Sequence, residues 1–166
     1  MEDRLTVSVG KINPNDYLAL NLFASDETSQ YLNTALDGND VLPVGYQGYT
    51  EGIAVQFLPL DWVYFNMVTS SASGTMGNYF EQSFDKGIFI GVEGGLLLKL
   101  LDRPIRLSAM WGTSNANLAT INGGPLVQGN CWAGIAQWLA TDDLGAWLQV
   151  AVSDQQVAYK IGRAHV

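Results

Sequence analysis

The chain has 166 residues, of which 48% are hydrophobic and 14% are charged, whereas an average soluble domain has roughly 25% charged residues. Its net charge of −8 argues against a nucleic-acid-binding surface, because a phosphate backbone requires clustered Lys and Arg. No apolar run is long enough for a membrane-spanning helix, so β-strands are predicted to carry the apolar residues.

A first strand is predicted at residues 5–11, where Leu5, Val7 and Val9 alternate with small or polar residues. A long connection with little alternation follows, and residues 26–36 within it are expected to form a short helix. A connection of this length in a compact domain is usually functional. The helix could fold inward as the constriction of a barrel, or it could form an external cap, and the sequence favours neither.

Two more strands are predicted at residues 49–58 and 62–69, with a turn at Pro59-Leu60-Asp61 between them. In the second strand, large apolar residues alternate with residues that can form hydrogen bonds. The apolar face has Val63, Phe65 and Met67, and the opposite face has Tyr64 and Asn66. Residues 70–86 are small and polar, which predicts a loop.

The most informative stretch is residues 87–114, which predicts a hairpin of two long strands with a turn at Asp102-Arg103-Pro104. The even positions of the first strand, from Ile88 to Leu100, are all apolar or glycine, and Glu93 and Lys99 lie on the other face. In a soluble sandwich the polar face would be crowded with charge. A sparse, Gly-rich face opposite a wholly apolar one is typical of a barrel wall whose outer side meets lipid.

The last hairpin is predicted at residues 130–139 and 144–153, after a loop at residues 115–129. The tight turns carry Asp61, Asp102 and Asp142, which recur at intervals of about 40 residues, so the chain contains an internal repeat. Short turns at one end of the strands and long loops at the other are typical of outer-membrane barrels.

Three tryptophans lie on the apolar phase of the predicted strands. Trp111 and Trp132 lie near the loop end and Trp138 lies near the turn end, as expected of two aromatic girdles. Together these patterns predict an all-β fold, namely an antiparallel up-and-down transmembrane β-barrel. The barrel is partial, because the chain supplies about seven strands of a larger one. The protein is expected to cross the lipid of the Gram-negative outer membrane several times.

Both ends of the chain are expected to be truncated. The chain enters a strand almost at once without a signal peptide, which an outer-membrane protein requires. Residues 161–166 read as the translation of a common sequencing-library adapter, so they are interpreted as an artefact and residues 1–160 as the partial barrel. The only histidine, His165, belongs to that artefact, and the natural protein is expected to continue beyond Lys160.

Several short motifs point to a known family. They are Gly10-Lys11-Ile12-Asn13, Asn21, Phe23-Ala24, Gln30-Tyr31-Leu32-Asn33-Thr34-Ala35-Leu36, and the stretch from Pro43 to Gln56 with Gly45, Tyr46, Gly48 and Tyr49. These segments resemble the carbohydrate-selective porin family of Gram-negative outer membranes. The resemblance implies a monomeric barrel of about sixteen strands that passes sugars by facilitated diffusion, with a loop or helix narrowing the lumen. The predicted strands are less than half of such a barrel.

A sugar conduit requires polar groups that exchange hydrogen bonds with hydroxyls, aromatic faces that stack on pyranose rings, and binding weak enough for fast flux. By alternation, the candidate lumen-facing, substrate-binding residues are Tyr64, Asn66, Glu93, Lys99, Arg106, Trp147 and Gln149. Glu93, Lys99 and Arg106 could form a charged ladder that meets the solute, or they could only pair with one another to hold the wall. For Asn66 and Gln149, a structural role is also open.

No catalytic or metal-binding motif is found, so neither an enzyme nor a cofactor is predicted. Without His165 there is no Ser-His-Asp or Cys-His arrangement, and metal ligation would depend on oxygen atoms alone. Cys131 is predicted to be a small buried hydrophobe. The pair Gly94-Gly95 lies inside a strand, where close approach of a neighbour explains it better than a phosphate loop does.

The sequence therefore predicts an outer-membrane porin for passive, facilitated diffusion of carbohydrates and similar small polar solutes. Two alternatives remain open. One is a non-conducting outer-membrane barrel, such as an adhesin or receptor, which inward bulky hydrophobic residues would favour. The other is a soluble all-β sugar-binding module, which two sheets packed on one core would favour.

Overall fold

The protein is described by a computed structural model that covers residues 4–20, 49–72, 84, 87–118, 127–142 and 144–153. The expected helix at residues 26–36 and the expected adapter sequence at residues 161–166 lie outside these described residues.

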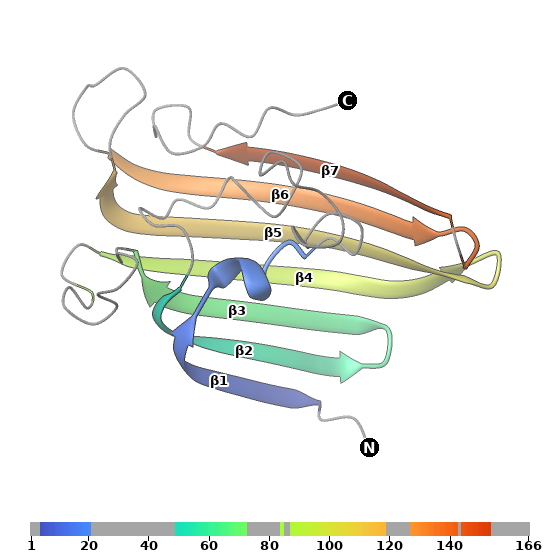
Figure 1. Cartoon of the computed structure of the whole chain (residues 1–166), viewed down its shortest axis with the longest axis horizontal. Helices are drawn as coiled ribbons and strands as arrows, with labels where there is room; N and C mark the ends of the chain where they lie inside the picture. The colour runs from blue at the N-terminus through green and yellow to red at the C-terminus, as the bar shows by residue number, and fades with distance from the viewer. Residues whose placement is uncertain are drawn as a thin grey trace.

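Among the described residues, seven β-strands form one antiparallel sheet in which strands adjacent in sequence are adjacent in space (Figure 1). The strands are β1 (Leu5–Ile12), β2 (Thr50–Leu60), β3 (Val63–Ser71), β4 (Ile88–Leu100), β5 (Arg103–Leu118), β6 (Val127–Leu139) and β7 (Gly145–Ser153). A short 3-10 helix, η1 (Pro14–Asp16), follows β1. The predicted fold class, an all-β up-and-down antiparallel sheet, is confirmed.

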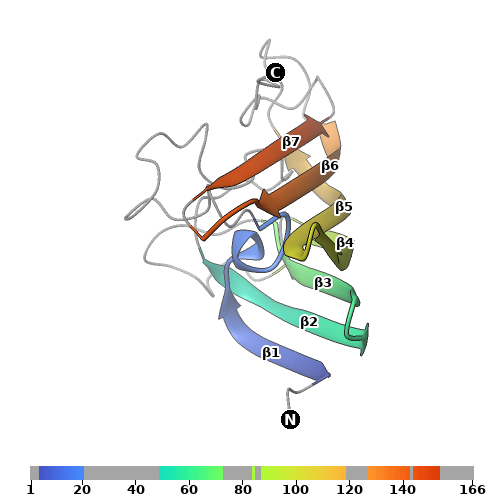
Figure 2. The same ribbon diagram turned by 90° about the vertical axis from the view of Figure 1, so that its right-hand side faces the viewer.

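The sheet is curved, and β1 and β7 are its edge strands (Figure 2). The β2–β3, β4–β5 and β6–β7 turns lie at one end of the strands, and the strand ends that flank the longer connections lie at the other end (Figure 1). This is the predicted asymmetry. In addition, η1 lies on the concave side of the sheet, where the sequence did not place it (Figure 2).

Two tight turns lie close to their predicted positions but are displaced along the chain. β2 continues through Pro59 to Leu60, and the chain turns at Asp61 and Trp62. Proline is tolerated in this strand because the pairing of β2 with β3 is irregular between Phe57 and Leu60, so no regular ladder hydrogen bond is lost.

The β4–β5 turn consists of Leu101 and Asp102, because Leu100 pairs with Arg103. Both turn residues have positive φ angles, 53° and 60°, as a two-residue hairpin turn of this hand requires. The predicted turn at Asp102-Arg103-Pro104 therefore begins one residue and ends two residues too late, since Arg103 and Pro104 already belong to β5.

The strands on either side of the β5–β6 connection are longer than predicted. The sequence predicted a loop at residues 115–129, but β5 continues to Leu118 and β6 begins at Val127. The polar residues Asn115 and Asn117 are exposed on either side of the buried Ala116. They do not end the strand, because backbone pairing needs no apolar side chain.

The face opposite η1, here called the outward face, carries the apolar phase of every strand, as predicted. One row of cross-strand partners runs through all seven strands: Val7, Val55, Met67, Val92, Trp111, Trp132 and Val152. Several of these side chains are exposed, with Trp132 at 60% and Val152 at 59%. The apolar sides of the strands therefore do not pack on one another as they would in a soluble core.

The tryptophans of the outward face lie at two levels along the strands. Trp111 pairs with Trp132, and their ring centroids are 6.0 Å apart. Trp138 pairs with Ala146 close to the β6–β7 turn. These positions are the ones from which the sequence predicted two aromatic girdles.

The concave face, here called the inward face, is not the uniformly wet wall that alternation predicted. A buried apolar cluster lies on it and includes residues that follow η1. The described members are Ile12, Leu18, Ala19, Ala54, Val68, Ala72, Phe89, Met110, Ala116, Cys131, Ala133 and Ile135. Alternation identifies the two faces correctly, but it cannot tell whether water or another part of the chain fills the concave side. Cys131 is buried, as predicted.

Candidate functional site

Three of the predicted lumen residues form a closed polar cluster on the inward face, here called the Glu93 cluster: Glu93, Tyr64 and Arg106. The Tyr64 hydroxyl donates a hydrogen bond of 2.6 Å to Glu93 Oε1, and Arg106 Nη2 donates one of 2.9 Å to the same oxygen. Arg106 Nε also donates a hydrogen bond of 2.7 Å to the Tyr64 hydroxyl. The Glu93 side chain has no exposed surface, so this pairing compensates a fully buried carboxylate.

Two adjacent glycines of β4 make room for aromatic rings of β3. Gly95 faces inward opposite Tyr64, and a Cβ atom on Gly95 would lie 2.2 Å from the Tyr64 ring. Gly94 faces outward opposite Phe65, and a Cβ atom there would lie 3.3 Å from the Phe65 ring. The absence of a side chain at Gly95 lets Tyr64 lie across β4 and reach both of its partners. The Gly94-Gly95 pair therefore allows side chains of the neighbouring strand β3 to lie close to the backbone of β4.

Residues 17–20, here called the inner segment, are bound to the inward face through their backbone. Asn66 Nδ2 donates a hydrogen bond of 2.8 Å to the carbonyl oxygen of Tyr17. The backbone N–H of Ala19 donates to Glu93 Oε2, and Gln137 Nε2 donates a hydrogen bond of 2.8 Å to the carbonyl oxygen of Leu20. Wall side chains from β3, β4 and β6 thus bind the segment at successive points.

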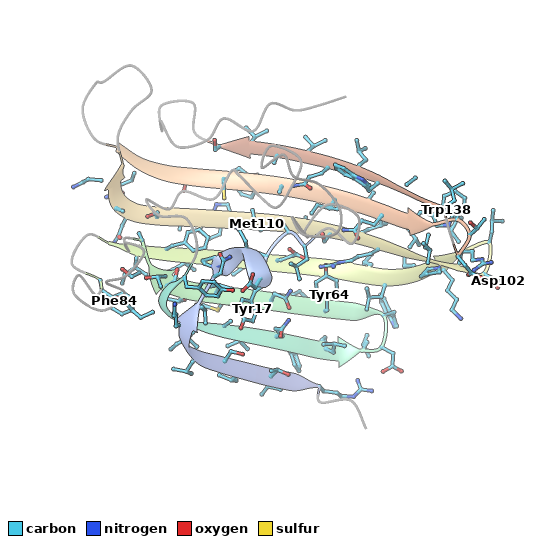
Figure 3. The ribbon with its side chains drawn as sticks, in the orientation of Figure 1. Tyr17, Tyr64, Phe84, Asp102, Met110 and Trp138 are labelled. Atoms are coloured by element: carbon cyan, nitrogen blue, oxygen red, sulfur yellow. The ribbon has the colours of Figure 1, made fainter. Side chains whose placement is uncertain are left out.

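The local sequence explains how the chain reaches this position. Asn13 caps η1, because its side-chain oxygen accepts a hydrogen bond of 3.2 Å from the backbone of Asn15, and Pro14 occupies the first helical position. The turn redirects the chain over the sheet, and Tyr17 lies above its middle (Figure 3). Leu18 is fully buried there and fills the space above Gly91, whose added Cβ atom would lie 2.3 Å from Leu18 Cδ1.

The structure brings together four of the seven predicted site residues. Tyr64, Glu93 and Arg106 form the cluster described above, and Asn66 is the cross-strand partner of Glu93. The other three lie on the same face but apart from them: Lys99, Trp147 and Gln149. Trp147 and Gln149 are half-buried on the edge strand β7.

The predicted charged ladder forms only in part. Glu93 and Arg106 make an ion pair of 2.9 Å. Lys99 is exposed beside the β4–β5 turn, roughly 20 Å from Glu93 along the strand, and no ion pair involves it among the described residues. The alternation of side chains places Lys99 on the same face as Glu93 and Arg106, but it does not show how far apart these residues lie along the strands.

Sequence reasoning missed the inner segment and Gln137. A signal for Gln137 was available, because it lies opposite Trp147 on the same phase of its hairpin. The apolar run Leu18-Ala19-Leu20 after a polar turn was a weaker signal. It indicates burial but does not identify the surface against which the residues pack.

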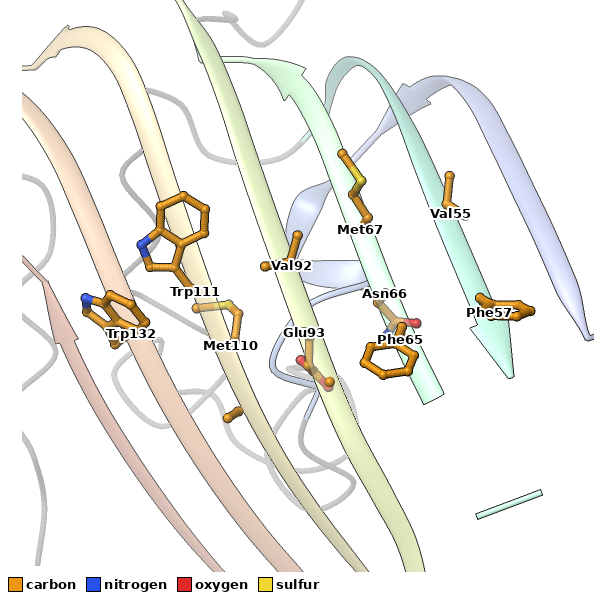
Figure 4. Close-up of a pocket in the computed structure, with 12 residues that line it drawn as sticks. Val55, Phe57, Phe65, Asn66, Met67, Val92, Glu93, Met110, Trp111 and Trp132 are labelled. Carbon is orange, nitrogen blue, oxygen red and sulfur yellow. The ribbon is translucent and has the colours of Figure 1, made fainter. Parts of the chain in front are cut away.

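A hollow of about 440 Å³ lies on the outward face, where the side chains of Val92, Trp111 and Trp132 border it (Figure 4). Its lining is mostly apolar and includes Val55, Phe57, Phe65 and Met67. Among the outward side chains that border the hollow, only the indole N–H groups of Trp111 and Trp132 can form hydrogen bonds, so it offers a sugar few polar partners.

The described residues hold no group of three or more His, Cys, Asp or Glu side chains that could bind a metal ion. Nor does that part of the chain include a helix with the length and apolarity needed to cross a membrane.

No protein-family model and no curated protein matches this chain. Among solved structures, the fold is similar to that of OprB from Pseudomonas putida, in a structure determined at high pH, with a TM-score of 0.71 and 19% sequence identity. The likeness covers 93% of this chain and 43% of the OprB chain, so this chain spans less than half the length of OprB. OprB is a carbohydrate-selective porin, and the predicted resemblance to that family is confirmed at the level of the fold.

Proposed function

We propose that this chain is part of an outer-membrane channel through which carbohydrates and similar small polar solutes diffuse passively. The observation that carries the proposal is the contrast between the two faces of the sheet. The outward row from Val7 to Val152 is apolar across all seven strands, whereas the adjacent inward row is polar in β1 to β4, with Thr6, Gln56, Asn66 and Glu93, and apolar in β5 to β7. An apolar exterior is what lipid requires, and a polar interior is what a hydrated solute requires.

The fold supports the proposal, because it is similar to part of a carbohydrate-selective porin. In a closed barrel, further strands would pair with the free edges of β1 and β7, since unpaired backbone groups are not tolerated in lipid. The channel would act by diffusion and without catalysis.

Solute contacts are proposed for the inward residues outside the Glu93 cluster. Trp147 offers an aromatic face to a pyranose ring, and Lys99 offers a charged group on the same face. Tyr64, Asn66, Glu93 and Arg106 are engaged with one another or with the inner segment, so their proposed role is to shape the conduit.

A second candidate is a non-conducting outer-membrane barrel, and one observation favours it. Leu18 and Phe89 are both fully buried on the inward face, where inward bulky side chains were expected to favour this alternative. A soluble sandwich is not supported, because the described strands form one sheet whose outward apolar residues stay exposed, instead of two sheets packed on a shared core.

The deciding experiment is conductance in planar lipid bilayers, made with the full-length barrel that contains this chain. We expect ion conductance that carbohydrates reduce as they occupy the lumen. Trp147→Ala should weaken this block by sugars, while Val152→Ala, on the lipid side of the same strand, should not. A barrel that folds, as shown by a heat-dependent shift in gel mobility, and yet never conducts would support the non-conducting candidate instead.

A further inference from the structure

The hollow on the outward face lies above two small residues of neighbouring strands. Gly94 of β4 pairs with Ala109 of β5, and neither fills the space above the sheet. Phe65 borders this space on one side, and Trp111 and Trp132 border it on the other (Figure 4). Every bordering residue belongs to β2–β6, so the described part of the chain supplies the floor and walls of the hollow but no cover.

A second hollow of about 400 Å³ shares Phe65, Gly94 and Ala109 with the first and continues toward the turn end, to Leu96 and Leu107. The two form one depression, here called the outer trough. Its walls on β3 and β6 are three strand spacings apart, about 14 Å between backbones, and their aromatic rings narrow it further. An α-helix is about 10–12 Å wide with its side chains and would not enter, whereas a single extended chain would.

The polarity of the outer trough indicates the class of its occupant. A protein interface has about one hydrogen bond per 100–200 Å². The outward side chains of the trough offer only the indole N–H groups of Trp111 and Trp132, and neither N–H donates a hydrogen bond within the described residues. A hydrocarbon chain needs no hydrogen-bonding partners, and in the trough it would make dispersion contacts that an empty hollow lacks.

The two tryptophans lie where the apolar phase of β5 and β6 ends. The next outward residues toward the loop end are Thr113 and Asn130, which pair with each other. Tryptophan favours the level of lipid headgroups, because its ring is apolar and its N–H group is polar. A lipid with its headgroup at this edge would bring an ester oxygen to an indole N–H and its hydrocarbon chain into the trough.

We propose that the outer trough binds one acyl chain of a membrane lipid, with the lipid headgroup at the edge formed by Trp111 and Trp132. The proposal rests on the outer-membrane location in the proposed function, which puts lipid against the outward face. It does not depend on the passage of solutes. It distinguishes the trough from the rest of the outward face, where lipid would meet larger apolar side chains such as Val7 and Val152.

Fluorescence quenching tests the site in the full-length barrel in detergent. A phosphatidylcholine with a brominated acyl chain quenches the tryptophans that it contacts, and the titration should saturate at one lipid per barrel. Replacing both Trp111 and Trp132 by Phe should remove the saturable part of the quenching. Quenching that rises without saturation, or a saturable signal that survives in this variant, would overturn the proposal.

Ala109→Phe keeps both tryptophans and fills the outer trough. The affinity for the brominated lipid should fall by roughly 10-fold, the factor that one hydrogen bond and its accompanying packing contacts provide. Val150→Phe is the matched control, because Val150 lies in the same cross-strand row on β7 but outside the trough. Its affinity should not change, and equal affinities of the two variants would contradict the assigned site. Ala109→Leu repeats the test if the larger ring prevents folding.

Two further measurements separate this proposal from its competitors. Light scattering detects a second copy of the barrel seated on the trough, and a dimer that Ala109→Phe dissociates would overturn the lipid site. Conductance in planar bilayers should be unchanged by Ala109→Phe, because Ala109 lies on the outward face. A barrel that binds the lipid as expected but never conducts would refute the channel function and leave the lipid site supported.

Discussion

The outward and inward faces of this sheet follow different rules, although they alternate residue by residue along the same strands. Outward side chains such as Val7 and Val152 share only apolarity and exposure. Inward side chains fit particular partners, as Tyr64 does over Gly95 and Leu18 over Gly91. A face proposed to meet lipid needs only the right class of residue, whereas a face that meets its own chain needs the right shape and hydrogen bonds.

The sharpest test of this difference is the removal of the buried carboxylate. Glu93→Ala should lower the free energy of unfolding by about 3–5 kcal/mol, because Arg106 is left with an uncompensated charge in a largely buried position. Adding Arg106→Met should restore much of the loss. Urea titrations of the full-length barrel in lipid vesicles measure both, and a loss below about 1 kcal/mol for the single variant would contradict the assigned ion pair.

A charge on the outward face provides the opposite test. Leu98→Arg should impair membrane insertion by about 2–4 kcal/mol, because Leu98 lies on the proposed lipid face. Its neighbour in the sequence, Lys99, faces inward, and Lys99→Ala should have little effect. The folded fraction after refolding into vesicles is the measurement. Equal effects at the two positions would show that the two faces have been assigned wrongly.

Substitutions at the adjacent glycines Gly94 and Gly95 of β4 allow the two faces to be compared at one point of the sheet. Gly95→Ala should cost about 1–3 kcal/mol, since the new methyl group would overlap the Tyr64 ring. Gly94→Ala should cost less than about 1 kcal/mol, because the 3.3 Å approach to Phe65 needs only a small shift of an exposed ring. The same urea titrations apply. A larger loss for Gly94→Ala would mean that the outward face is as closely fitted as the inward one.

The smallest expected effect is at the β4–β5 turn, which belongs to neither face. Asp102→Gly should stabilise the barrel by about 1 kcal/mol, because glycine adopts a φ of 60° without the steric cost that a Cβ atom brings. Asp102→Ala keeps the Cβ atom and should give no such gain. If both variants gave the same increase in the free energy of unfolding, the turn conformation would not be its cause.

Particular residues show why some features were predictable. The outward placement of Val63, Phe65 and Met67 follows from a period of two along one strand, which is a local property that tertiary contacts did not change. The predicted strand boundaries were less accurate where a residue type occurs both in turns and within strands. Pro59 signals a turn in most contexts, but here it occupies an irregular position within β2.

The candidate site shows where local information ends. The alternation of side chains predicted that Tyr64, Glu93 and Arg106 lie on one face, and in the structure they do. It could not show that they form one cluster while Lys99 stays apart. The roles of these residues toward a solute remain predictions.

The sequence by itself determined the strands, their pairing order and the two faces, because hairpins form between neighbours and side chains alternate with a fixed period. Only the tertiary structure decided what occupies the concave side. The inner segment binds Asn66, Glu93 and Gln137 across separations of 49, 74 and 117 residues. No local pattern encodes contacts over such distances, since they join parts of the chain that only the folded sheet brings together.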